Sequence, residues 1–528
     1  MEPATVPLNP PEALRGNPRE HPLYPTKKTP WLETPFVHSP SLSKLANCQI
    51  FLKLEHLQPS GSFKSRAMGS QILSHLSKLK NEQGKLTKKV HFFASSGGNA
   101  GLAAVCAAQS LGYPCTVVVP APTPDHMFDR LYAAGAEEVV KFGETIAAAG
   151  VYMKDVVMKG AHRERLQEKD EGEDIAKIAL HPFDDESIWE GNSTIINELE
   201  KQLPLVIEDD QEQKPNDDNY NDLPLPVDAI ICSVGGGGLM NGLIMGLERL
   251  KQKKQQQKQQ ACTDKAKKIH ILAAETEGTH SLSLSLSRRT LITLPRITSK
   301  AISLGVVRVS ERTFQLALNP PDGIEVHSVV LSDAEAARGV LSLVDSERVL
   351  VELACGVCVD VAVGSASWSS SLLLPGADSK ADTGGKVSGI TTTSTGNTPK
   401  KRKRTPSMGH GDQSGRLPPS LSACAKTEEI DVDTVDMNMH TSTSMNPSSD
   451  ESDSSSLSAP MSPSSEATEV TLLSDDSTGQ FKSKLHQLLP NLTPKSRVVI
   501  IVCGGSNVTL GMAAKWRELL KNGWIEKS

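Results

Sequence analysis

A lysine in a short loop of small residues is the first side chain of this sequence that could do chemistry. Lys64 lies in QPSGSFKSRAMG, residues 58–69, where serines and a glycine surround its amine. A solvated lysine needs no such neighbours, because any exposed helix would carry it. Small residues instead favour a tight turn in which the backbone approaches a bound molecule. The sequence therefore raises the hypothesis that Lys64 binds or reacts with a ligand.

A glycine-rich segment, SVGGGGLMNGL (233–243), follows the apolar run VDAIIC and leads into an expected helix. Its four glycines let backbone N–H groups converge on an anion at the helix N-terminus, which is how many phosphate sites are built. The segment lacks the GK[ST] of a nucleoside-triphosphate loop, and its spacing does not match GxGxxG. Taken alone, it is also compatible with a flexible turn.

Two further segments repeat this arrangement of strand, small residues and helix. SSGGNAG (95–101) offers hydroxyls, backbone donors and the Asn99 amide, which suit a small carboxylate or a phenolic oxygen, although a serine-capped helix start would look the same. VCGGSN (502–507) follows a third strand-like run. Ligands of open α/β sheets bind at the carboxyl ends of the strands, so these loops and Lys64 are expected to meet. A phosphate-bearing cofactor that forms a Schiff base with lysine is pyridoxal 5′-phosphate.

The segments that must position these loops alternate between strand-like and helix-like patterns. Strands are predicted for CQIFLKLE, KVHFFAS, PCTVVVP, VDAIICSV, KIHILAAE and SRVVIIVCGG, and helices for GNAGLAAVCAAQSLG and for residues 123–140, TPDHMFDRLYAAGAEEVV. Short apolar strands that alternate with helices indicate parallel sheets covered on both faces, an α/β fold.

The composition limits the class of protein. The chain has 528 residues, a formal net charge of −6 and a hydrophobic share of only 38%, so part of it is expected to be disordered. The acidic balance argues against a general nucleic-acid binder. No apolar run is long enough to span a membrane, and the nine scattered cysteines are typical of a reduced, cytoplasmic protein.

Together the motifs resemble those of the serine/threonine dehydratases within the fold-type II pyridoxal-phosphate enzymes, above all the animal and fungal L-serine dehydratases. The resemblance rests on QPSGSFKSR, SSGGNAG, PFDDESIWEGNSTI, SVGGGGL, AETEGTHS, LPRITSKAISLGV, ELACG and VCGGSN, which occur in the family's order. It implies two parallel-sheet α/β domains with the cofactor in the cleft between them. It also implies deamination of L-serine to pyruvate and ammonia, and of L-threonine to 2-oxobutanoate.

The same resemblance assigns roles to individual residues. Lys64 would hold the cofactor and act as general base, Phe63 and Ser303 would lie near the two ring faces, and Asn99 would bind the phenolic oxygen. Cys503 would face the pyridine nitrogen, while Ser96, Gly97 and Asn99 would form the loop for the substrate carboxylate. The backbone amides that would hold the phosphate belong to Gly235, Gly236, Gly237, Gly238 and Leu239. Potassium would bind at Gly235, Glu275, Thr279, Leu304 and Val306, mostly through carbonyl oxygens.

The resemblance also sets the expected domain boundaries. An N-terminal tail (1–29) precedes a catalytic region (30–366), in which a small domain, roughly 65–170, is inserted in the large one. A low-complexity, disordered insertion (367–490) then separates this region from the C-terminal completion of the catalytic domain (491–528). The chain departs from its relatives at this insertion and at Leu353, where they commonly carry proline.

Other interpretations remain open at this stage. The same cofactor would serve a serine racemase, a threonine synthase or a cysteine synthase-like lyase. Relatives that racemise place a serine at the position of Gly97, which predicts elimination without D-serine. A catalytically impaired, nuclear or regulatory homologue is the alternative of a different class, because KKRKR at 400–404 could be an import signal. A small-molecule amino-acid substrate, a homodimer and neither membrane nor nucleic acid as partners are expected.

Overall fold

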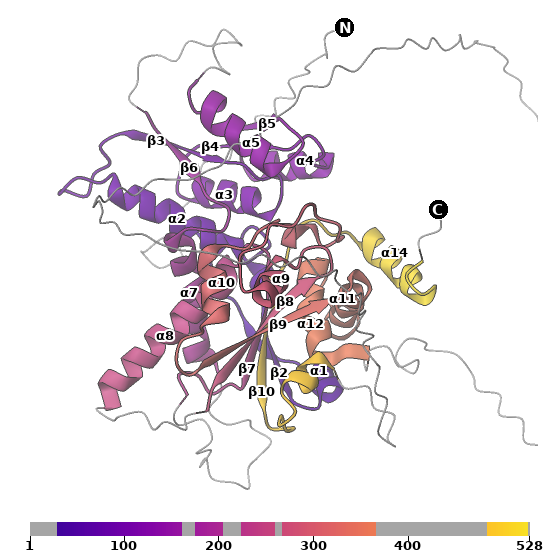
Figure 1. The fold of residues 1–528 in the computed structure, drawn as a ribbon. Coiled ribbons are helices and arrows are strands. Elements are labelled where there is room, and N and C mark those ends of the chain that lie inside the picture. Colours follow the sequence, from indigo (N-terminus) through magenta and orange to yellow (C-terminus); the bar gives the residue numbers. More distant parts are fainter. Residues whose placement is uncertain (1–28, 161–174, 204–222, 259–266, 366–482, 526–528) are drawn as a thin grey trace, which may run out of the picture. The chain divides into compact units, whose positions relative to one another are not determined.

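The computed structural model describes residues 29–160, 175–203, 223–258, 267–365 and 483–525. Ten strands form two sheets within one compact unit of the chain (Figure 1). The strands are β1 (Phe36–His38), β2 (Gln49–Lys53), β3 (Lys89–Ala94), β4 (Cys115–Val119), β5 (Glu138–Lys141), β6 (Ile175–Leu180), β7 (Ala229–Ser233), β8 (Ile269–Thr276), β9 (Ile324–Leu331) and β10 (Arg497–Ile501). The expected α/β class with two parallel-sheet layers is confirmed.

The larger sheet has the strand order β1-β2-β10-β7-β8-β9, and only β1 is antiparallel to its neighbour. Strand β10 lies centrally although it follows β9 by more than a hundred residues. Val498 and Ile500 of β10 enter one buried apolar cluster, whereas Val499 and Ile501 enter the other, on the opposite face. Its run RVVII is buried throughout, as expected for a parallel strand covered on both faces.

The smaller sheet has the order β5-β4-β3-β6, and all of its strands are parallel. It reaches past the expected boundary at residue 170 to include β6. Figure 1 shows this sheet with helices α2 to α5 in the upper part of the molecule and the larger sheet below it. The helix predicted over 123–140 is wrong in its second half, because α4 ends at Ala133 and residues 138–141 form β5. Gly135, at φ +93°, turns the chain between the two elements.

The helices cover the faces of the two sheets. They are α1 (Pro40–Ala46), α2 (Lys64–Lys78), α3 (Asn99–Ser110), α4 (Asp125–Ala133), α5 (Ile146–Tyr152), α7 (Glu186–Gln202), α8 (Gly238–Lys258), α9 (Ser281–Arg288), α10 (Glu311–Leu318), α11 (Asp333–Glu347), α12 (Leu353–Val363), α13 (Lys484–Leu488) and α14 (Leu510–Lys521), with short turns η2 (Glu55–Leu57), η3 (Met153–Val157) and η5 (Ile302–Leu304). Leu353, the departure from the relatives' proline, is the first residue of α12. Proline is common at the first position of a helix but is not required there, and α12 begins at Leu353 without it.

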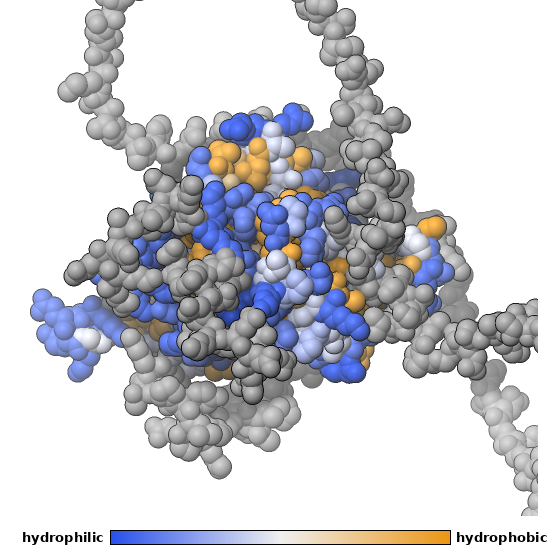
Figure 2. Space-filling view, turned by 90° about the horizontal axis from the view of Figure 1, so that it is seen from below, coloured by the Kyte–Doolittle hydropathy of each residue, from blue (hydrophilic) through white to orange (hydrophobic). Residues whose placement is uncertain are grey.

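Figure 2 shows hydrophilic residues over most of the visible described surface, with hydrophobic residues in small groups. Isolated exposed apolar side chains of this kind are ordinary on folded proteins. Among the described residues, no helix is both long and apolar enough to cross a membrane.

The two described ends of the long insertion lie next to each other. Residues 366–482 lie outside the described part, and so does the basic run 400–404. A Cβ atom built on Gly364 would stand 3.1 Å from the Cα of Ser483. Ser483 caps α13, and Leu485 is fully buried among the core residues. The sequence predicts that the fold resumes at residue 491, but the described fold already resumes at residue 483.

This proximity leads to the first prediction. Replacing residues 367–480 by a linker of about four residues should leave the fold intact, and with it the cofactor site that the resemblance implies, because the linker spans neighbouring ends. Shorter loops cost less closure entropy, by about 0.6 kcal/mol per halving. Thermal unfolding and visible absorbance of the purified variant check this. A lower midpoint of unfolding would contradict it, and a deletion that extends through Leu485 is the destabilised control.

Candidate active site

Lys64 is the first residue of α2, directly after the turn that leads out of β2. The preceding turn is fastened to the loop after β10, because Phe63 N–H donates to the carbonyl of Cys503 at 3.2 Å and Ser62 forms a bridge with Gly504. The Lys64 amine makes no hydrogen bond within the described part of the chain. Burial lowers its pKa, and the nearby Glu352 and Cys503 only partly offset this effect. A lowered pKa makes the amine easier to deprotonate than that of an exposed lysine.

The loop after β7 carries a run of backbone N–H groups without an acceptor. The N–H groups of Gly235, Gly236, Gly237, Gly238 and Leu239 donate to no acceptor in the described residues. Helix α8 begins at Gly238, so its positive end adds to these donors.

Side chains cannot replace these glycines. A Cβ atom on Gly236 would lie 2.2 Å from the Phe183 ring, and one on Gly237 would lie 1.9 Å from Oγ1 of Thr313. Gly237 also has a φ of +94°, which disfavours other residues. The local packing therefore leaves no room for a side chain at these two positions. The five N–H groups that have no acceptor in the described residues are suited to bind a phosphate.

Asn99 lies at the start of α3, at the carboxyl end of the small sheet, and reaches the loops of the large sheet. Its Nδ2 donates to Ser303 at 3.1 Å and to Glu352 at 2.9 Å, and its Oδ1 accepts from the N–H of Ser506 at 2.8 Å. The structure thus brings together Asn99, Ser303 and the loop that carries Cys503, as expected.

Cys503 is buried below this amide and belongs to a group of thiols. Ser233 donates to its sulfur at 3.6 Å, and Cys355 lies within hydrogen-bonding reach. These two donors lower the pKa of Cys503, whereas burial raises the pKa of Cys355 well above its ordinary value. The seven cysteines in the described residues are all free thiols.

Ser96 and Gly97 lie between β3 and α3. The Ser96 hydroxyl accepts from the N–H of Gly98 at 3.3 Å, and the helix end of α3 points its free N–H groups toward this loop. Such a helix end favours a carboxylate. A Cβ atom on Gly97 would lie 2.6 Å from the side chain of Thr123, so this position is closed to larger residues unless Thr123 moves.

The sequence did not point to Glu352, which lies at the centre of the site. One of its carboxylate oxygens accepts from Asn99 and from the N–H of Asn507 at 2.7 Å, and the other accepts from the Ser303 hydroxyl. Glu352 is the N-cap residue of α12, a position that favours serine, threonine, aspartate or asparagine, and its side chain makes no capping hydrogen bond there. The sequence signal that could have identified Glu352 is its position as the first residue of the ELACG motif.

The predicted potassium residues lie in three segments, after β7, at the end of β8, and at η5 and just after it. Gly235 packs against Leu304, since a Cβ on Gly235 would lie 3.3 Å from the Leu304 carbonyl oxygen, and Val306 donates to that oxygen at 2.7 Å. Glu275 is the last residue but one of β8, and its two oxygens accept from the N–H groups of Leu282 and Ser283 rather than from a lysine. Burial raises the pKa of Glu275 to about 8.

Two nearby hydroxyls complete this region. The Thr279 hydroxyl donates to the carbonyl of Thr276 at 3.0 Å. The hydroxyl of Ser281 is buried and has no hydrogen-bond partner, an orphan oxygen that the sequence analysis missed. No hydrogen bond of the described residues joins Glu275 to Gly235 or to Leu304. The oxygen-rich surroundings fit a hard cation.

Comparisons with known proteins identify the family. Residues 28–371 match the family model described as pyridoxal-phosphate dependent enzyme. The chain is 37% identical over 314 residues to the catabolic L-serine/threonine dehydratase of Saccharomyces cerevisiae, covering 60% of this chain and 75% of the relative. It is 36% identical over 328 residues to the L-serine dehydratase/L-threonine deaminase of Mus musculus, covering 62% of this chain and 81% of the relative.

A solved structure shares the fold. The fungal L-serine ammonia-lyase from Rhizomucor miehei aligns with a TM-score of 0.54 at 22% sequence identity, covering 93% of this chain and 99% of that one. Since the family model spans well over half of the sequence and the curated relatives are matched over most of their length, the chain belongs to the family of pyridoxal-phosphate dependent enzymes.

Proposed function

We propose that the protein deaminates L-serine to pyruvate and ammonia, and L-threonine to 2-oxobutanoate, by elimination of water. The observation that carries this proposal is the position of Lys64. Its amine lies near Glu352 and Cys503, and burial lowers its pKa. Glu352 accepts hydrogen bonds from the loops after β3 and β10, and the free amides of the loop after β7 would complete the site. The names of the curated relatives support the same reaction.

The residues around Lys64 are suited to hold pyridoxal phosphate. The amides of the loop from Gly235 to Leu239 would bind its phosphate, and Asn99 would donate to the phenolic oxygen. Phe63 and Ser303 would lie at the ring faces, and the Cys503 thiol would meet the pyridine nitrogen. Because a thiol is a weak donor, it leaves that nitrogen less than fully protonated.

The chemistry of the step divides between cofactor and protein. When bound, pyridoxal phosphate withdraws electrons from Cα of the attached amino acid, which acidifies the Cα proton and lets the β-hydroxyl leave. The Lys64 amine would take that proton as general base, and its lowered pKa favours the neutral form that this role needs. Ser96, Gly97 and the N-terminus of α3 would bind the substrate carboxylate and fix the direction of the Cα–H bond.

A keto-acid assay on purified full-length protein tests this function. Pyruvate should form from L-serine and 2-oxobutanoate from L-threonine, each with one equivalent of ammonia. A protein that carries the cofactor but forms neither keto acid would contradict the proposal, and would favour another lyase of the family or a catalytically impaired homologue.

Racemisation is the alternative that Gly97 argues against. Racemases need a second base on the face opposite the lysine, and Gly97 has no side chain to provide one. We expect D-serine to be negligible beside pyruvate in a chiral analysis of the serine left after partial turnover. Appreciable D-serine would overturn this assignment.

The structure indicates which variant should introduce racemisation. Gly97→Ser alone would press its Cβ against Thr123, which lies 2.6 Å away, so the loop would shift. The double variant Gly97→Ser with Thr123→Ala removes that contact. We expect D-serine formation to rise at least about tenfold in the double variant relative to Thr123→Ala alone, within the range of a general base. Equal D-serine in both proteins would count against the second-base argument.

We further propose that potassium binds at Gly235, Glu275, Thr279, Leu304 and Val306, with the orphan Ser281 hydroxyl as an additional ligand. The bound ion would support the loop that begins at Gly235, and would thereby order the amides that bind phosphate. Activity should fall when potassium is replaced by lithium. Glu275→Gln should raise the potassium concentration needed for half-maximal activity by about 10- to 100-fold, a range typical of lost metal-site contacts. An unchanged requirement would exclude Glu275 as a ligand, and Glu277→Gln is the neighbouring control.

Assembly and location remain proposals. We propose a homodimer in the cytoplasm, in keeping with the free thiols of the described residues. Sedimentation of the purified protein tests the first point. Cell fractionation tests the cytoplasmic location. If the basic run 400–404 is an import signal, the wild type should be found in the nucleus and a variant without that run in the cytoplasm.

A further inference from the structure

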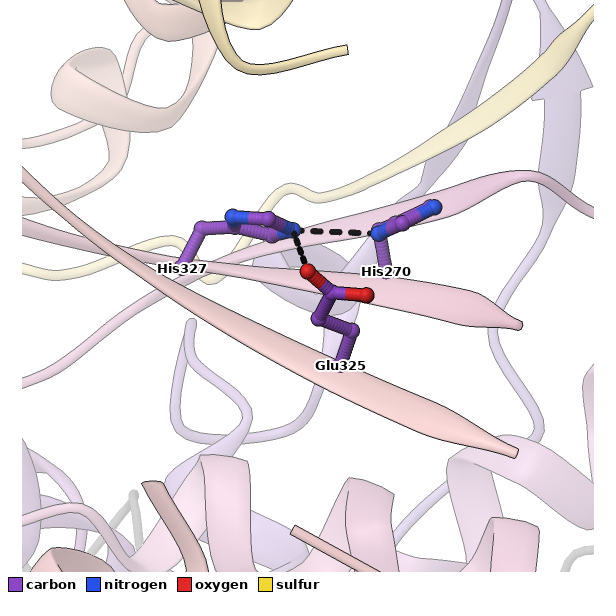
Figure 3. Close-up of side chains that lie close together, drawn as sticks. All are labelled: His270, Glu325 and His327. Carbon is purple, nitrogen blue, oxygen red and sulfur yellow. Dashed lines mark hydrogen bonds and ion pairs between the residues drawn. The ribbon is translucent and has the colours of Figure 1, made fainter. Parts of the chain in front are cut away.

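Two histidines and a glutamate face one another on neighbouring strands, away from the active site (Figure 3). His270 lies on β8, and Glu325 and His327 lie on the edge strand β9. His270 is paired with Glu325 in the parallel register, and His327 follows two residues later, on the same face of the sheet. All three are near the amino ends of their strands, whereas the glycine loops follow the carboxyl ends.

The distances within this His–Glu–His cluster are close to those of a metal site. Nδ1 of His270 lies 3.0 Å from Nε2 of His327, and that nitrogen lies 3.8 Å from Oε1 of Glu325. All three ligand atoms lie within 4.8 Å of one another. Ligands at 2.0–2.1 Å from a tetrahedral zinc ion stand about 3.3 Å apart, so small side-chain movements would complete the geometry.

The protonation of the cluster also suits a metal. Burial lowers the pKa of both histidines, and the neighbouring His327 lowers that of His270 further. Neutral imidazoles keep the lone pairs that bind a metal. Each of the three residues is half-buried, so an ion can enter from solvent. The Lys268 ammonium, 3.4 Å from Oε2 of Glu325, competes for the carboxylate but leaves its other oxygen toward His327.

We propose that His270, Glu325 and His327 bind a zinc ion that fastens the edge strand β9 to β8. Two imidazole nitrogens and one carboxylate oxygen are ligands that zinc prefers, and three protein ligands leave one coordination position for water. The alternative is a metal-free hydrogen bond between the two rings, in which one nitrogen donates and the other accepts. The two differ in whether the cluster holds an ion, so they can be separated by experiment.

Zinc titration of the untagged, full-length protein with its cofactor bound tests the proposal. After dialysis against a chelator, the wild type should take up one more zinc ion per chain than Glu325→Gln or His327→Asn. Glu325→Gln keeps the size of the side chain at a partly exposed position, and its cofactor absorbance reports that the fold is intact. His126→Asn, an exposed histidine on α4, is the matched control and should bind zinc like the wild type.

Two further measurements separate a built site from stray binding. Lys268→Met removes the competing ammonium and should tighten zinc binding several-fold, the opposite direction to the ligand variants. Zinc should raise the midpoint of thermal unfolding in the wild type and in His126→Asn, but not in Glu325→Gln. Equal zinc content and equal dissociation constants in the wild type, Glu325→Gln and His327→Asn would overturn the proposal. An unchanged or weaker affinity in Lys268→Met would also contradict it.

Discussion

Lys64→Ala is expected to lower kcat for pyruvate formation from L-serine by about 10³-fold or more. The substitution removes both the amine that holds the cofactor and the general base, and a general base alone contributes about 10²- to 10⁴-fold. Phosphate binding should persist, because the amides of the Gly235–Leu239 loop are untouched. The variant should therefore still take up the cofactor, more weakly, with a changed visible absorbance. Steady-state assay and absorbance of the same preparation measure both effects.

The control for this prediction lies on the same helix. Lys78 is an exposed residue at the other end of α2, so Lys78→Ala removes a lysine without touching the site. It should keep the activity and the absorbance of the wild type. If Lys64→Ala retained more than about a tenth of the activity, the assignment of the general base would be wrong.

Arg66→Leu is expected to lower the free energy of unfolding by about 3–5 kcal/mol, the usual cost of leaving a buried carboxylate without its partner. The fully buried guanidinium of Arg66 binds Glu55 through two hydrogen bonds, at 2.7 and 2.8 Å. It also binds both oxygens of Glu198, at 2.5 and 2.7 Å. The variant would leave Glu55 without its ionic partner, while Glu198 would keep the Lys53 ammonium, at 2.5 Å, and the hydrogen bond from the N–H of Thr34, at 3.3 Å.

This network ties the start of α2 to its surroundings, because Glu55 lies in η2 and Glu198 in α7. Arg66 is only two residues from Lys64, so the variant should also lose cofactor affinity. Urea denaturation gives the free energy. Lys253→Met, which breaks an exposed ion pair with Glu200, is the control and should cost at most about 1 kcal/mol. A similar small loss in Arg66→Leu would show that the network does not stabilise the fold.

Much of the fold follows from local sequence patterns. Runs such as VDAIICSV and SRVVIIVCGG can be recognised as strands, because β-branched residues cover both faces of a parallel sheet and small residues end each run. The strand order does not follow from such patterns. Strand β10 pairs with β2, more than four hundred residues earlier, and local periodicity says nothing about so distant a partner. The helix expected over 138–140 fails for a local reason. Gly135, at φ +93°, follows the end of α4, and the chain then continues as strand β5.

Three parts of the candidate site can be recognised in the sequence. Lys64, the SVGGGGL loop and Asn99 stand out because their neighbours are unusual for ordinary surface segments. Glu352 does not stand out, since a glutamate before a helix is common, and its contacts with Asn99, Ser303 and Asn507 exist only once distant loops meet. The cluster of His270, Glu325 and His327 does not stand out for the same reason, because His270 is more than fifty residues from the other two and only the register of two strands brings them together.

Borohydride reduction followed by peptide mass analysis tests most directly whether the chemistry is built on Lys64. Borohydride converts the carbon–nitrogen double bond between pyridoxal phosphate and a lysine into a stable single bond, so the attached lysine can be identified after proteolysis. The account predicts one reduced cofactor per chain, on the peptide that contains Lys64, and none when an excess of L-serine occupies the site before reduction. Attachment to another lysine, or a protein that carries no reducible cofactor after reconstitution, would contradict it.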